Sequence, residues 1–195
     1  KWVSLHPGFM RLVFADLPDF SAQISAYVSS PPGFSHLPPE LYQAVTAYSD
    51  AAKKIAAAGN YDIVHAHDWL CFPAGIAAAS VSGLPFIAHV HATEFDRSGG
   101  LSANPAIFSI EKKGMDKASK IIALSNFLKN LLVRNYHEPT GKISVVHNGI
   151  NSEEFSQAPP GDPFIPFKKA GFKIVSYIGR LTLQKGVDYL IKSAA

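Results

Sequence analysis

The sequence has a single cysteine, Cys71, among its 195 residues. One cysteine excludes an intramolecular disulfide framework and a cysteine-rich zinc module. No apolar run reaches the about 18 residues that a membrane-spanning helix requires, and no basic and apolar leader opens the chain. These absences predict a cytoplasmic protein without a membrane span.

An excess of charge of one sign is also lacking. The 18 Lys and Arg residues nearly balance the 15 Asp and Glu residues, so the formal net charge is only +3. Such a small and dispersed surplus does not indicate a nucleic-acid partner. Hydrophobic residues make up 47% of the chain and charged residues 17%, which is enough for a sizeable core and excludes wholesale disorder.

Two nucleotide-binding motifs are absent as well. The sequence contains neither G-x-G-x-x-G, typical of dinucleotide sites, nor G-x-x-x-x-G-K-[ST], the phosphate-binding P-loop. Neither a dinucleotide site nor a P-loop is therefore expected.

What is present is an alternation of predicted strands and helices. Six short runs are rich in β-branched and aromatic residues and lie between turn signals. These runs are Met10–Ala15, Tyr61–His67, Pro85–Val90, Lys120–Leu124, Lys142–His147 and Phe172–Ile178. Their nearly continuous apolar character is typical of parallel strands.

Helical patterns separate these strands. An apolar stripe at steps of three and four runs from Leu41 to Ile55, and further helices are expected at Ala74–Val81 and Asn104–Lys117. Ser125 is a predicted N-cap for a fourth helix, whose packed residues would be Phe127, Leu128, Leu131 and Leu132. This alternation predicts an α/β fold, a Rossmann-like parallel sheet with helices on both faces.

A change in composition divides the chain. Residues 156–171 hold four prolines and two glycines without helical or strand periodicity, which indicates a linker. We expect residues 1–155 to form one domain, lacking its first strand and Gly-rich loop, and residues 172–195 to begin a second Rossmann-like domain. A lone βα unit cannot bury its apolar face, so Val187, Leu190 and Ile191 should stay exposed unless another surface covers them, in an oligomer for example.

Polar residues follow three of the predicted strands. They are Asp68, the segment from His91 to Glu94, and Asn148. Ligands of open α/β sheets bind beyond the carboxyl ends of the strands, so these residues are candidates for a binding site.

Two H-x-H pairs, His65/His67 and His89/His91, permit a second interpretation. Alternate residues of a strand point the same way, so each pair could offer two imidazoles to zinc, with Asp68 close by. The alternative is that the deeper rings, His65 and His89, are hydrogen-bonded core residues. We expect no metal and no stoichiometric zinc in the purified protein.

A basic loop, GRLTLQKG, spans Gly179–Gly186 between a predicted strand and a predicted helix. Its two cations, Arg180 and Lys185, together with the helix N-terminus, would favour a diphosphate. An ordinary solvated turn would have the same composition.

Five segments together resemble one family. They are YDIVHAHDWL (Tyr61–Leu70), HVHATEFDRSG (His89–Gly99), IEKKGMDKASKIIALS (Ile110–Ser125), KISVVHNGIN (Lys142–Asn151) and YIGRLTLQKGVDYLI (Tyr177–Ile191). In this order they resemble family 4 retaining glycosyltransferases, which have the two-domain GT-B architecture and are related to glycogen and starch synthases.

The resemblance implies a nucleotide-sugar donor held mainly by the second domain, a carbohydrate or other acceptor held by the first, and no cofactor. It implies that Gly179, Arg180 and Lys185 bind the donor, with both cations stabilising the departing diphosphate. It assigns His91 to the transferred sugar as a catalytic residue. The acceptor side of the cleft would hold Asp68, Glu94 and Asn148.

Other functions stay open at this point. Within the family, the alternative is a glycogen or starch synthase that uses ADP- or UDP-glucose. Outside it, the alternatives are a zinc metallohydrolase built on the H-x-H pairs and a non-catalytic carbohydrate-binding module. The downstream carboxylate motif of the family's second domain lies beyond Ala195, so we expect this fragment to be inactive alone.

Overall fold

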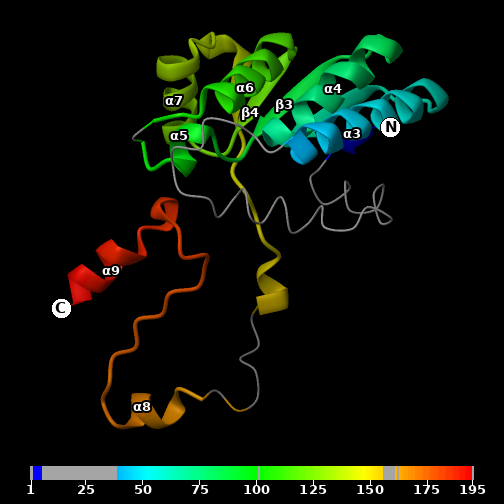
Figure 1. Ribbon diagram of the computed structural model, residues 1–195. Coiled ribbons are helices and arrows are strands. Elements are labelled where there is room, and N and C mark those ends of the chain that lie inside the picture. The colour runs from blue at the N-terminus through cyan, green and yellow to red at the C-terminus, as the bar shows by residue number, and fades with distance from the viewer. Residues whose placement is uncertain (1, 6–38, 101, 156–160, 162, 195) are drawn as a thin grey trace. The chain divides into compact units, whose positions relative to one another are not determined.

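The computed structural model describes residues 2–5, 39–100, 102–155, 161 and 163–194 (Figure 1). The chain divides into two compact units, Lys1–His147 and Asn148–Ala195. Among the helices of the described ranges, none is both long and apolar enough to cross a membrane.

The first unit is built on a five-stranded parallel sheet. Its strands are β1 (Trp2–Leu5), β2 (Ile63–His67), β3 (Phe86–Val90), β4 (Lys120–Ala123) and β5 (Ile143–Val145). They pair in the order β1-β2-β3-β4-β5, and every pair is parallel. The predicted α/β class with a parallel sheet is confirmed.

Helices connect these strands. They are α3 (Pro39–Ala58), α4 (Asp68–Ser82), the short α5 (Glu94–Arg97), α6 (Pro105–Lys117) and α7 (Asn126–Tyr136). The side chain of Asn104 accepts the first amides of α6, and the Ser125 side chain accepts the amide of Leu128 at 3.1 Å. These caps fix where α6 and α7 begin.

One face of the sheet packs against these helices. Val64 and Ala66 of β2 are buried and lie in register with Phe86 and Ala88 of β3. The buried side chains of α3, α4, α6 and α7 join them in one hydrophobic cluster, and Figure 1 shows α3 and α4 side by side. This core holds the carboxyl ends of β2 and β3 in place.

The opposite face of β2 and β3 is only half-buried and carries histidines. Burial alternates along both strands, so His65 and His67 of β2 and His89 of β3 lie on this second face. In the register, His67 is directly opposite His89.

Three sequence-based expectations for the first unit need correction or comment. The strand at Trp2–Leu5 was not predicted, and the strand predicted at Met10–Ala15 lies outside the described residues.

The helix expected from Ala74 begins at Asp68 instead and includes Pro73. Its first turns are helical because they bury four apolar side chains, those of Trp69, Leu70, Cys71 and Phe72. Phe127 does not pack in the core, because 73% of it is exposed on the outer side of α7.

The second unit contains η2 (Ser152–Phe155), α8 (Ile165–Lys169), η3 (Leu183–Lys185) and α9 (Val187–Ala194). The strand predicted over Phe172–Ile178 is not formed. In the described part of the chain this segment pairs with no strand, and most of its large apolar side chains are exposed. No residue of α9 is buried: Ile191 is exposed, as expected, whereas Val187 and Leu190 are half-buried rather than exposed.

Candidate functional site

The carboxyl ends of β2 and β3 are joined by a carboxylate. Asp68, the residue after β2, accepts a hydrogen bond at Oδ1 from the backbone N–H of His91, the residue after β3, at 2.7 Å. Asp68 has a φ of 59°, a left-handed conformation that is uncommon outside glycine. Asp68 and His91, which the sequence placed at the ends of separate strands, are therefore joined by a hydrogen bond.

The ring of His91 is also fixed. Its Nε2 lies 2.8 Å from Nδ1 of His67, within hydrogen-bond distance, and the two rings stack with centroids 5.2 Å apart. His91 is half-buried, so its ring borders both the sheet and the solvent. Asp68 therefore holds the backbone of His91, and the preceding residue, His67, holds its ring.

A second pair of rings lies deeper on the same face. Nε2 of His65 lies 3.1 Å from Nδ1 of His89. Burial, and next the charge of His91, lower the pKa of both rings, and that of His89 falls to about 4. Because of this shift, His89 is uncharged at neutral pH.

The turn after His91 leads into α5 through a capping box. The Thr93 N–H and hydroxyl both donate to Oδ2 of Asp96, at 2.7 and 2.8 Å. The Asp96 carboxylate thus pairs the Thr93 amide, which the helix itself would leave unpaired. The turn that carries Glu94 is thus fixed at its start.

Glu94 is buried rather than open to solvent. Its carboxylate forms an ion pair with Arg97 (Oε2 to Nε, 3.0 Å), and only 8% of the residue is exposed. Burial raises the pKa of Glu94, and the Arg97 guanidinium partly offsets this effect. The candidate carboxylate therefore lies inside the turn, where it shapes the loop after β3.

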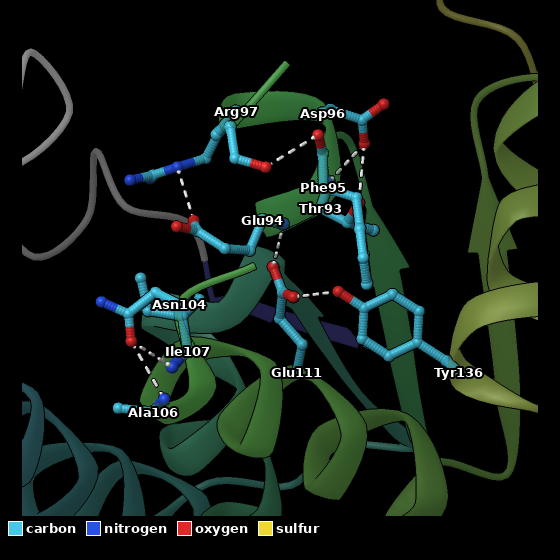
Figure 2. Close-up of polar contacts among 11 residues, drawn as sticks. Thr93, Glu94, Phe95, Asp96, Arg97, Asn104, Ala106, Ile107, Glu111 and Tyr136 are labelled. Carbon is cyan, nitrogen blue, oxygen red and sulfur yellow. Dashed lines mark hydrogen bonds and ion pairs between the residues drawn. The ribbon is translucent and has the colours of Figure 1, made fainter. Parts of the chain in front are cut away.

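Glu111, in the middle of α6, is a site residue that the sequence analysis missed. Figure 2 shows its carboxyl group between the turn and α7: Oε1 accepts the Glu94 N–H at 3.0 Å, and Oε2 accepts the hydroxyl of Tyr136. Burial raises the pKa of Glu111 to about 8. A sequence signal existed, because Glu111 lies on the buried stripe of α6 between Ile107 and Met115.

An open groove lies beside this turn. It has a volume of about 560 Å³ and lies between the α5 region and the outer face of α7. Its lining includes Phe95, Asp96, Phe127, Asn130 and Arg134. Aromatic and polar side chains thus face the same hollow next to the candidate site.

The remaining predicted residues belong to the second unit. Asn148 is its first residue and is exposed. Gly179, Arg180 and Lys185 are exposed in a compact loop, where the Arg180 carbonyl accepts the Tyr177 hydroxyl at 2.6 Å and the Thr182 N–H at 3.0 Å. The predicted order of loop and then helix is confirmed, since α9 follows at Val187.

The first unit also contains a group of potential metal ligands. His65, His67 and His89 can each offer one ring nitrogen so that the three atoms lie within 4.8 Å of one another. The sequence analysis had considered the two H-x-H pairs separately, whereas the structure places their rings together.

The fold and the site define a class of protein. A Rossmann-like parallel sheet with polar residues beyond the carboxyl ends of neighbouring strands is typical of α/β proteins that bind a ligand at that edge. The particular family follows from comparison with known proteins. The sequence profile of Glycosyltransferase Family 4 matches residues 10–154, and the chain belongs to this family.

Curated relatives agree with this membership. An uncharacterized glycosyltransferase of Methanocaldococcus jannaschii is 30% identical over 187 residues, which cover 91% of this chain and 48% of the relative. A D-inositol 3-phosphate glycosyltransferase of Mycolicibacterium gilvum is 30% identical over 70% of this chain and 32% of its own length. A glycogen synthase of Mycobacterium tuberculosis is 30% identical over 65% of this chain and 30% of its own. The chain thus spans about half or less of the relatives it matches.

A solved structure shares the fold. The Anabaena protein HepE, determined in complex with UDP, matches with a TM-score of 0.59 and 18% identity. The match covers 100% of this chain and 57% of HepE. The Rossmann-like fold expected from the sequence for the first unit is thereby confirmed.

Proposed function

We propose that the longer protein containing this chain transfers a sugar from a nucleotide-sugar donor to a carbohydrate or other acceptor, with retention of the anomeric configuration. Membership of Glycosyltransferase Family 4 supports the reaction class. The observation that carries the proposal is the joined edge of β2 and β3, where the Asp68 carboxylate and the His67 ring hold His91. The chain alone is inactive in this proposal, since its relatives are about twice as long or longer.

His91 would contact the transferred sugar. Its Nε2 is engaged by His67, which leaves Nδ1 and the ring edge for a substrate hydroxyl. A ring held in one orientation is pre-organised for such a contact, which limits the entropy lost when substrate binds. Asp68, the turn of Glu94 and Asn148 would contribute to acceptor binding.

Arg180 and Lys185 would bind the donor diphosphate. Both are exposed in the loop before α9, and neither appears among the described ion pairs. Negative charge grows on the leaving diphosphate as the bond to the sugar breaks, so cations fixed beside it lower the barrier. Gly179 would let the backbone approach the phosphates, and the transfer would need no cofactor.

The names of the relatives do not agree on an acceptor. One is a D-inositol 3-phosphate glycosyltransferase and another a glycogen synthase. A synthase that uses ADP- or UDP-glucose therefore remains the second candidate within the family. The cytoplasmic location and an oligomer formed through the second unit also remain predictions.

A screen of nucleotide sugars tests the proposed reaction. The longer protein would be incubated with UDP-, ADP- and GDP-sugars and a set of acceptors, and the released nucleoside diphosphate would be measured. We expect release with at least one donor, accelerated by an acceptor, and a product of the donor's anomeric configuration. An inverted product, or no release with any donor by the folded protein, would contradict the proposal.

A further inference from the structure

Four imidazole rings gather on the half-buried face of the sheet. His65 and His67 come from β2, His89 from β3, and His91 directly follows β3. Because strand neighbours in register lie close together, the rings form a cluster with neighbouring centroids between 4.4 and 5.2 Å apart.

Three of these rings have the spacing of metal ligands. Each of His65, His67 and His89 has one ring nitrogen that lies within 4.8 Å of the corresponding nitrogens of the other two. Zinc binds imidazole nitrogen at about 2.0–2.1 Å in a tetrahedron, which places two ligand nitrogens roughly 3.3 Å apart. Binding of an ion would replace the hydrogen bond between His65 and His89 and draw the three nitrogens closer together.

The rings are also in a form suited to binding. Nε2 of His89 is buried and has no hydrogen-bond partner, an uncommon situation for a ring nitrogen. The Asp68 carboxylate, by contrast, accepts the His91 amide and is outside the cluster.

We propose that His65, His67 and His89 together bind one divalent transition-metal ion, such as zinc, cobalt or nickel, with a water molecule as the fourth ligand. Three imidazoles suit these metals and disfavour magnesium and calcium, which prefer oxygen ligands. The ion takes no part in the proposed transfer reaction, although one of its ligands, His67, also holds the ring of His91. The proposed site departs from the expectation of a metal-free protein stated in the sequence analysis.

Metal binding has a structural consequence that can be measured. The ion would link β2 to β3 in the folded protein, and the unfolded chain does not hold the three ligands together. A ligand that binds only the folded state raises its stability. The melting temperature should therefore rise with zinc concentration.

The test uses the chain without an affinity tag, titrated with cobalt chloride and with zinc chloride at pH 7.5. We expect saturation at about one ion per chain, visible absorption of tetrahedral cobalt, and a higher melting temperature with zinc. His89→Gln and His67→Gln should each weaken binding at least about tenfold, since each removes one of three ligands. The matched control is His137→Asn: His137 is exposed with a φ of 56°, a conformation that Asn tolerates, and affinity should not change.

Two results would overturn the proposal. One is the absence of saturable binding by the folded parent chain, which would show that the rings only hydrogen-bond to one another. The other is unchanged affinity in a folded variant of the cluster. If His89→Gln fails to fold, as judged by circular dichroism, the metal affinity of the His67→Gln variant, whose substitution lies at the end of β2, tests the proposal instead. Neither result bears on glycosyl transfer, so the two proposals fail separately.

Discussion

At the scale of single residues, the carboxyl group of Glu111 connects three segments. It accepts the Glu94 amide from the turn after β3 and the Tyr136 hydroxyl from α7, while its own backbone belongs to α6. Only 2% of the residue is exposed, so its ionised form lacks the hydration that it would have in water. The geometry of the candidate site therefore depends on a group that is neutral when the fold is most stable.

Glu111 should make the stability of the protein depend on pH. Its pKa is about 8 in the folded protein and near 4.5 when unperturbed, so its contribution is fully present below pH 4.5 and is lost as pH rises towards 8. The slope for one proton is at most about 1.4 kcal/mol per pH unit. Glu111→Gln mimics the neutral acid, and urea unfolding between pH 5 and 8 should show a flatter decline. Exposed Glu40→Gln is the control, and an unchanged slope in Glu111→Gln would refute this role.

At the scale of elements, α7 shows how local signals and packing combine. Leu128, Leu132 and Tyr136 recur every four residues and are buried, whereas Phe127 lies one position around the helix and is exposed. The N-cap Ser125 fixes the start of the helix, and the stripe fixes which face meets the sheet.

Two neighbouring substitutions in α7 test this arrangement. Leu128→Ala should lower the free energy of unfolding by about 2–5 kcal/mol, because it leaves a cavity in the core. Phe127→Ala should change it by no more than about 0.5 kcal/mol, since the ring lies in solvent beside the groove. Chemical denaturation of both variants measures the difference. Equal losses would mean that α7 is rotated relative to the structure.

Much of the fold of the first unit is predictable from local sequence. Strand–helix alternation predicted four of the five strands, and the N-cap Ser125 predicted where α7 begins. The pairing of Trp2–Leu5 with β2 was not predictable, because its partner lies about 60 residues away in the register. The Glu111 contacts were missed for the same reason, since they join residues 17 and 25 positions apart.

At the scale of the whole molecule, the segment 172–178 has a sequence typical of a strand but does not form one. Its apolar residues match a buried strand, yet Val175 and Ile178 are 73% and 97% exposed. A strand needs neighbouring strands to pair its backbone N–H and C=O groups. The described part of the second unit contains no such strand.

Hydrogen exchange should detect this difference. In the isolated chain, the amides of residues 173–178 should exchange within the dead time of the measurement, because they lack backbone partners. In the longer protein, where we expect them to join a second parallel sheet, the same amides should be protected. Protection of this segment in the dilute monomeric chain would contradict the proposed second domain.

The central claim, that Arg180 and Lys185 hold the leaving diphosphate, is tested most directly by the turnover of the longer protein. Arg180→Ala and Lys185→Ala should each lower kcat and kcat/KM, at a loss of about 2–4 kcal/mol of transition-state stabilisation. Arg180→Lys should also be impaired, since lysine lacks the bidentate grip of a guanidinium. His91→Ala should reduce transfer, while Lys53→Ala, an exposed cation on α3, should leave it unchanged. Folded Arg180→Ala and Lys185→Ala variants that both turn over donor at the parent rate would contradict the account.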